Sequence, residues 1–149
     1  MENVFDLSPL VKLSESDKPL WGIMSPQHMV EHFIQAVLLS NGGLKNSQCM
    51  NPPEKLPVLK RFLLSPRPLP KNFINTVIGG DLKPLINKDL ESALKTLLNE
   101  IDKIGVYFIN NPEALPINPT FGPLNKEEWI RFHKKHFNHH FEQFGIIGN

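Results

Sequence analysis

The chain has 149 residues, of which 40% are hydrophobic and 21% are charged, values typical of a single soluble domain with a buried core. Sixteen Lys and Arg residues against fifteen Asp and Glu residues give a net charge of +1, so no basic excess favours a nucleic-acid partner. The chain shows no signal-peptide pattern, no apolar run long enough to cross a membrane and only one cysteine, Cys49. We therefore expect a cytoplasmic protein without an internal disulfide.

Helical spacing of apolar residues dominates the chain, and we expect an all-α protein. A short first helix is predicted through Phe5, Leu10 and Leu13. A second begins at Ser25-Pro26, because serine suits an N-cap and proline the first helical position. This helix should continue to Leu38 and end before Asn41-Gly42-Gly43.

Residues 51–84 are rich in proline and are predicted to be largely irregular. Two short helices are expected within them, over Leu56–Leu64 and over Pro70–Ile78, the second closed by Gly79-Gly80. Enough leucine and phenylalanine is present for burial, which argues against a disordered linker. A long functional loop beside a site is the alternative interpretation.

A long helix is predicted from Lys88 to Phe108, where apolar residues recur at helical spacing. The last helix should start after Asn125, because Glu128 three residues later completes a capping-box pattern. Gly145 suits the position just past its end. The whole chain, residues 1–149, is expected to form one domain.

The last helix carries four of the six histidines within eight residues, His133 to His140. At about 100° per residue, one face of this helix holds a set of polar and aromatic side chains: Trp129, His133, His136, His140 and Gln143. His136 and His140 are four residues apart and could ligate one ion from the same side. His139 points away from this face and is expected to be exposed to solvent.

The second helix offers a third ligand. His28 and His32 are also four residues apart, and His32 lies closer to the apolar arc of that helix. The economical metal site is therefore His32 with His136 and His140. Three neutral imidazoles would leave coordination positions open for water or substrate. Nickel, zinc, iron and manganese cannot be separated on this ligand set alone.

Plainer roles compete with each of these assignments. His136 and His140 could be ordinary helix-face residues, and His28 is better explained as a non-ligand. His133 is either a spare ligand or a residue that supports a ligand.

Other side chains have two interpretations each. Glu31 could support a ligand or act as a general base, or it could be surface charge. The Gln143 amide could bond a ligand, or it could simply end the helix. The Asn118 amide could reach a pocket, or it could form the turn before Pro119. Trp21 and Trp129 are expected in the core or at a pocket rim.

Two stretches resemble a known superfamily. The early one reads Trp21-Gly-Ile-Met-Ser-Pro-Gln-His-Met-Val-Glu-His32-Phe and resembles the opening helix of the DinB/YfiT-like superfamily of metal-dependent proteins. The later one is similar to a branch of that superfamily with no assigned function; it reads Asn118-Pro-Thr-Phe-Gly-Pro-Leu-Asn-Lys-Glu-Glu-Trp129 and continues with His136-Phe-Asn-His-His140-Phe-Glu-Gln-Phe-Gly145.

The resemblance implies a four-helix bundle with up-down-down-up helix order and proline-rich irregular connections. It also implies a divalent metal ion held by His32, His136 and His140, the same three residues that the helix geometry selects. Relatives often carry histidine before the Pro-x-Phe-Gly turn, where this chain has Asn118, so their chemistry could be altered here.

Two functions follow as hypotheses. The first is a metal-dependent enzyme, either a thiol transferase or a hydrolase, that acts on a small molecule and uses Glu31, His28 or His133 to carry protons. The second is a non-catalytic metal- or ligand-binding bundle, as a monomer or a homodimer. The substrate and the reaction are not defined by the sequence.

Overall fold

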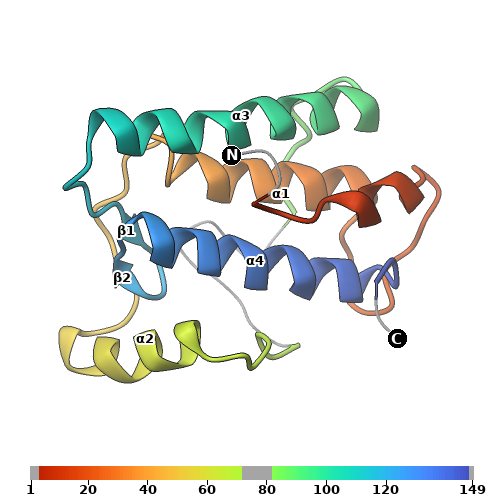
Figure 1. The fold of residues 1–149 in the computed structure, drawn as a ribbon. Coiled ribbons are helices and arrows are strands. Elements are labelled where there is room, and N and C mark those ends of the chain that lie inside the picture. The colour runs from red at the N-terminus through yellow and green to blue at the C-terminus, as the bar shows by residue number, and fades with distance from the viewer. Residues whose placement is uncertain (1–3, 72–81, 148–149) are drawn as a thin grey trace.

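The computed structural model describes residues 4–71 and 82–147 and is mostly helical (Figure 1). Within these residues four α-helices, two short 3-10 helices and one small hairpin are formed. The 3-10 helices are η1 (Ser8–Lys12) and η2 (Pro53–Lys55), and the strands of the hairpin are β1 (Ile117–Asn118) and β2 (Gly122–Pro123). The α-helices are α1 (Pro26–Leu38), α2 (Leu56–Leu64), α3 (Leu90–Asn110) and α4 (Lys126–Gln143).

Helices α1 and α3 pack side by side and run in the same direction (Figure 1). At their N-terminal ends, the Gln27 side chain donates a hydrogen bond to the Asn87 carbonyl at 2.7 Å. Further along both helices, the Asn41 amide donates to the Glu100 carbonyl at 2.9 Å. From the first contact to the second, the residue number rises on both segments, as parallel helices require.

Helix α4 packs against the other side of α1 and runs in the opposite direction (Figure 1). Ser40, just past the end of α1, contacts His133 in the first half of α4. Helix α2 lies beside α4 and runs with it, because Lys60 pairs with Glu128 at 3.0 Å and Lys135 donates to the Ser65 carbonyl. From top to bottom in Figure 1, the helices therefore lie in the order α3, α1, α4, α2.

In chain order the four helices alternate in direction, with α1 and α3 running one way and α2 and α4 the other (Figure 1). This differs from the up-down-down-up order that the superfamily resemblance implied. Many residues separate α1 from α2 and α2 from α3, so local residues do not determine the direction in which the next helix runs.

The helix starts follow the local sequence signals. Ser25 accepts a hydrogen bond from the His28 N–H at the start of α1, with proline in the first turn, as predicted. Asn125 and Glu128 form the predicted capping box of α4. Gly145 adopts a φ of 66° just past the C-cap Phe144, in the left-handed region that glycine tolerates.

Several boundaries differ from the predictions. The first predicted helix is only the 3-10 turn Ser8–Lys12, and the long helix begins two residues later than expected, at Leu90 with Asp89 as its N-cap. The predicted helix over Pro70–Ile78 lies almost wholly outside the described residues. The hairpin of β1 and β2 departs from the all-α prediction, since Ile117 pairs with Pro123 and Asn118 with Gly122.

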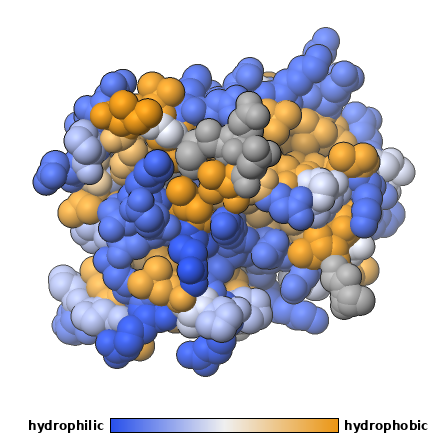
Figure 2. Space-filling view, in the orientation of Figure 1, coloured by the Kyte–Doolittle hydropathy of each residue, from blue (hydrophilic) through white to orange (hydrophobic). Residues whose placement is uncertain are grey.

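One apolar core joins α1, α3 and α4. Helix α1 buries nearly all of its predicted apolar face, including Met29, Val30, Phe33 and Val37, each 0% exposed. Apolar side chains also reach the surface in separate patches among polar ones (Figure 2). Within residues 4–71 and 82–147, no helix is both long and apolar enough for a membrane span.

Candidate metal centre

Three histidines from two distant parts of the chain meet between α1 and α4. His32 comes from α1, and His136 and His140 come from successive turns of α4. Each offers one ring nitrogen, and the three nitrogens lie within 4.8 Å of one another. Because α1 and α4 are antiparallel neighbours, two turns of one helix face the middle of the other, which brings the three rings together.

The rings are closely packed. The ring centroids of His32 and His136 are 4.6 Å apart, and that of His140 lies 4.9 Å from each. The Nε2 atoms of His32 and His136 are 2.8 Å apart. At this distance one of the two nitrogens must carry a proton, because two lone pairs cannot face each other so closely.

Burial keeps the three imidazoles neutral. His136 and His140 are 2% and 7% exposed, and His32 is half-buried. Burial lowers the pKa of His32 to about 4 and that of His140 to about 3, with neighbouring charges adding to the effect. It also holds the pKa of His136 well below its ordinary value. Neutral imidazole is the form that binds metal ions.

Phenylalanines surround the cluster on its inner side. The Phe33 ring lies 5.5 Å from both His136 and His140, and Phe132 stacks on His136 at 5.3 Å. Phe141 is fully buried against Phe33. Such a shell excludes water from one side of the cluster, and the half-buried His32 is the ligand candidate nearest to solvent.

Gln143 supports the ring of His140. Its Oε1 lies 2.6 Å from His140 Nδ1, and its Nε2 donates to the Trp21 carbonyl at 2.9 Å. Of the two predicted roles of Gln143, the geometry therefore favours the one in which its amide forms a hydrogen bond with a candidate metal ligand, His140. The other ring nitrogen of His140, Nε2, is left for the centre of the cluster.

The donor set fits a divalent metal ion. It consists of neutral imidazoles whose ring nitrogens converge, and ions such as zinc, nickel, iron and manganese accept imidazole nitrogen. His136 Nδ1 is buried without a hydrogen-bond partner among the described residues. Its Nε2 meets another imidazole Nε2 instead of an ordinary acceptor. If both Nε2 atoms instead served as ligands of a metal ion, neither would need to carry the proton that they now share.

His133 and His28 lie outside the three-histidine cluster. His133 is fully buried, and its Nε2 is 2.8 Å from the Ser40 hydroxyl. Burial lowers its pKa to about 3. His28 Nδ1 lies 2.6 Å from the Ser25 hydroxyl at the start of α1. These contacts favour the simpler interpretation of His28 as a non-ligand and place it structurally at the start of α1.

His139 corrects one prediction, because it is only 6% exposed instead of facing solvent. It forms a hydrogen bond with the backbone of Leu69, and its ring meets those of Trp21 and His140. The segment after α2 runs along this side of α4 and covers it. A helical projection of α4 alone could not include that cover.

The Glu31 carboxylate is hydrogen-bonded to the segment just before α3. Its carboxylate accepts hydrogen bonds from the N–H groups of Ile86 and Asn87 at 2.8 and 2.9 Å, and from the side chains of Asn87 and Gln27. Burial alone would raise the pKa of this carboxyl, but the N–H groups outweigh it and lower the pKa. The contacts describe a residue that fastens two segments together.

Asn118 forms a turn, the simpler of its two predicted roles. Its Oδ1 accepts from the N–H groups of Thr120 and Phe121 at 2.9 and 3.1 Å. The side chain is completely buried, and its Nδ2 has no partner among the described residues. The residue at this position therefore shapes the hairpin beside α4.

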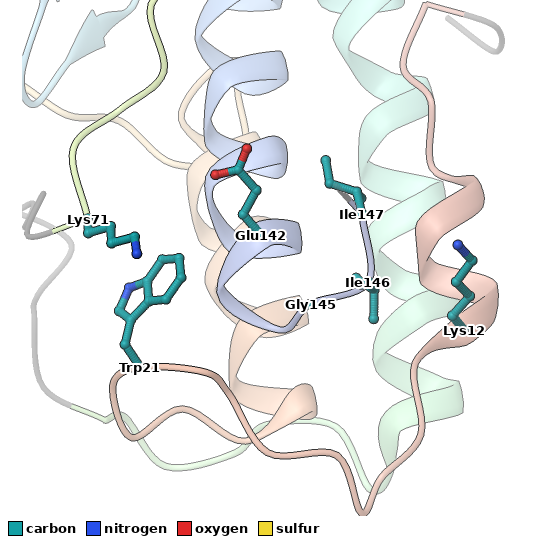
Figure 3. A pocket seen from close by; sticks show the side chains of 7 residues that line it. All are labelled: Lys12, Trp21, Lys71, Glu142, Gly145, Ile146 and Ile147. Carbon is teal, nitrogen blue, oxygen red and sulfur yellow. The ribbon is translucent and has the colours of Figure 1, made fainter. Parts of the chain in front are cut away.

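The two tryptophans lie as predicted, Trp129 in the core and Trp21 at the rim of a cleft. Trp129 is fully buried and donates from its ring N–H to the Pro116 carbonyl at 3.0 Å. Trp21 lies at an open cleft of about 580 Å³ beside the last turn of α4, with the Lys71 ammonium 4.8 Å from its ring centroid (Figure 3). The three histidines are not among the residues that line this cleft: Lys12, Trp21, Lys71, Glu142, Gly145, Ile146 and Ile147.

The helices and the buried histidines define a class: a mostly helical protein with three imidazoles that could hold one metal ion. Over residues 25–145 the chain matches, and it belongs to, the family described as Protein of unknown function (DUF1569). The matched region includes His32, His136 and His140. No curated protein and no solved structure shows significant similarity to the chain.

Two residues that contact His133 and Gln143 were not predicted. Ser40 was not singled out, although a polar residue directly after the buried face of α1 is a usable signal. Gly22 was not singled out either; its φ of 83° and its place against the Gln143 side chain depend on a tertiary contact. No pattern within the loop reveals such a contact.

Proposed function

We propose that the protein binds one divalent metal ion through His32, His136 and His140. The observation that carries the proposal is the convergence of three neutral, mostly buried ring nitrogens within 4.8 Å. The resemblance of the two histidine segments to the DinB/YfiT-like superfamily supports it independently. The ligand set does not select among nickel, zinc, iron and manganese.

A function built on this site would be metal-dependent chemistry on a small molecule, such as thiol transfer or hydrolysis. A bound ion would supply Lewis acidity toward a thiolate, a carbonyl group or water. The chain itself would contribute the fixed imidazoles, the water-excluding ring of Phe33 and the half-buried side of His32 as the approach. A small thiol cofactor is the partner that this proposal favours.

A second proposal is a metal-binding protein without catalysis. It is favoured by what the proton-carrier candidates contact: Glu31 holds Ile86 and Asn87, His28 meets Ser25, and His133 meets Ser40. In each case the group that could carry a proton is already hydrogen-bonded to a residue outside the three-histidine cluster. Catalysis at this site would then need a proton carrier from the substrate, the cofactor or solvent.

Metal content tests the shared premise. The protein is purified without nickel affinity, freed of metal with a chelator and titrated with Zn²⁺, Ni²⁺ and Mn²⁺. One equivalent of bound ion is expected for the wild type, and the His136→Ala and His140→Ala variants should lose it. His28→Ala is the matched control and should bind normally. Absence of binding for all three ions would overturn the proposal.

Turnover separates the enzyme from the binder. The metal-loaded protein is screened with glutathione, bacillithiol and coenzyme A against electrophiles, and with small ester and amide substrates. Product formation that disappears with the chelator and in His136→Ala would support the enzyme. Stoichiometric binding without turnover in either screen would favour the second proposal.

A further inference from the structure

We infer that Gln143 is a positioning residue that holds His140 as the Nδ1–H tautomer and leaves Nε2 free for the metal ion. The inference goes beyond the choice of ligands, because it assigns a proton and a nitrogen to one of them. Its consequence for affinity rests on the proposed function, whereas the tautomer itself does not.

The orientation of the Gln143 amide follows from chemistry. A backbone carbonyl accepts hydrogen bonds and cannot donate them. The amide atom that faces the Trp21 carbonyl at 2.9 Å must therefore be the NH₂ group. Reversing the amide would place two oxygens against each other. The atom that faces His140 is consequently Oε1.

The tautomer of His140 follows from this orientation. Oε1 of Gln143 lies 2.6 Å from His140 Nδ1 and can only accept a hydrogen bond. Nδ1 must therefore carry the ring proton. In a neutral imidazole the remaining nitrogen, Nε2, then has the free lone pair that a metal ion needs. A hydrogen bond of this kind on the distal nitrogen also orients the ring.

The loop before α1 is built to keep Gln143 in place. The Leu20 N–H donates to the Gln143 carbonyl at 2.6 Å, so the loop meets both the backbone and the side chain of the same residue. Gly22 has a φ of 83°, and a Cβ there would lie 2.6 Å from Gln143 Nε2. Only glycine allows the loop to approach the amide this closely.

The first measurement reads the tautomer directly. Long-range ¹H–¹⁵N spectra of metal-free protein at pH 7 distinguish a protonated ring nitrogen from one with a lone pair, and His140→Asn assigns the signals. Wild-type His140 should show protonated Nδ1. Gln143→Met, which keeps the length but loses the acceptor, should move protonation toward Nε2. A wild-type ring protonated on Nε2 would overturn the inference.

The second measurement is metal affinity. Gln143→Met should bind Zn²⁺ about 10- to 100-fold more weakly, the usual effect of losing such a supporting bond. Gln143→Glu retains an acceptor for Nδ1–H and should recover both the tautomer and part of the affinity. Gly22→Ala should give an intermediate loss, because it disturbs the amide without changing it. Unchanged affinity in Gln143→Met would contradict the positioning role.

A control and a distinction complete the design. Gln48→Met makes the same exchange at an exposed position of the loop after α1 and should alter neither measurement. If the wild type binds no metal, the proposed function fails while the tautomer still tests the inference. If the wild type binds metal and Gln143→Met changes neither tautomer nor affinity, the inference fails alone.

Discussion

His32 and His136 lie 104 positions apart in the chain, yet their Nε2 atoms are 2.8 Å apart. The two residues come from antiparallel helices that meet only when the core of α1 and α4 is formed. The cluster is therefore a product of folding, and an unfolded chain offers only scattered histidines. A ligand that needs all three rings must bind the folded state preferentially.

Metal binding should accordingly stabilise the protein. With free Zn²⁺ at 100 times its dissociation constant, the free energy of unfolding should rise by about 2.7 kcal/mol. For a chain of this size that corresponds to an increase in Tm of roughly 6–10 °C. Thermal unfolding followed by circular dichroism, with and without Zn²⁺, measures the shift.

Histidine variants show whether the Zn²⁺-dependent increase in Tm comes from binding at the three-histidine cluster. His32→Ala should remove most of the metal-dependent shift, whereas His28→Ala, on the same helix, should retain it. A similar shift in both variants would mean that Zn²⁺ stabilises the fold at another place.

His133 should make stability depend on pH. The burial that lowers its pKa from 6.5 to about 3 keeps it neutral in the folded state, while the unfolded state takes up a proton below pH 6.5. The unfolded state therefore binds more protons, and stability falls as the pH decreases from 6.5 toward 3. At pH 4.5 this histidine alone should cost roughly 2–3 kcal/mol relative to pH 7.

Replacing His133 with phenylalanine, whose ring cannot be protonated, tests whether this histidine causes the loss of stability at low pH. His133→Phe keeps the aromatic contacts with Trp129 and Phe137, and Ser40 still donates to the Val37 carbonyl. Urea unfolding with chelator present, at pH 7 and pH 4.5, should show a smaller loss of stability in the variant. Equal losses in the wild type and the variant would place the acid sensitivity in other groups.

Local features of the sequence were enough to predict much of this structure. Ser25-Pro26 and Asn125 with Glu128 determine where two helices begin through bonds within one turn. The candidate ligands could be found because His136 and His140 share a helix face and His32 borders an apolar arc. These are short-range relations, and the fold preserves them.

Features that depend on a second segment could not be predicted. His139 is buried because the segment after α2 covers it, and Gln143 is held by a carbonyl of the loop before α1. A backbone acceptor has no signature in the sequence, because every residue supplies one. The alternating helix directions likewise depend on how α2 and α3 pack after long connections.

Glu31 should contribute to stability more than to metal binding. Glu31→Ala would remove the acceptor of the Ile86 and Asn87 N–H groups and release the segment before α3. A loss of about 2 kcal/mol is expected, with Zn²⁺ affinity within roughly twofold of the wild type. Chemical unfolding and titration calorimetry measure the two effects.

Glu91→Ala is the matched control, because that carboxylate is 80% exposed and pairs loosely with Lys95 at 3.8 Å. It should change stability very little. If Glu31→Ala abolished Zn²⁺ binding at unchanged stability, the carboxylate would belong to the metal centre.

Asn118 should act on the fold through the hairpin. Its Oδ1 fixes the N–H groups of Thr120 and Phe121, and the Phe121 ring packs 6.0 Å from Phe132, which stacks on His136. Asn118→Ala leaves two buried N–H groups without an acceptor and should cost roughly 2–3 kcal/mol of stability. Zn²⁺ affinity should change less than about threefold, since the residue reaches the cluster only through two rings.

Urea unfolding and Zn²⁺ titration of Asn118→Ala separate these two effects. Asn138→Ala, at an exposed position of α4, is the control and should leave both measurements near those of the wild type. A large loss of Zn²⁺ affinity at unchanged stability would instead show that the Asn118 amide acts on the metal centre. Such a result would assign the residue before the Pro-x-Phe-Gly turn to the metal centre of this chain.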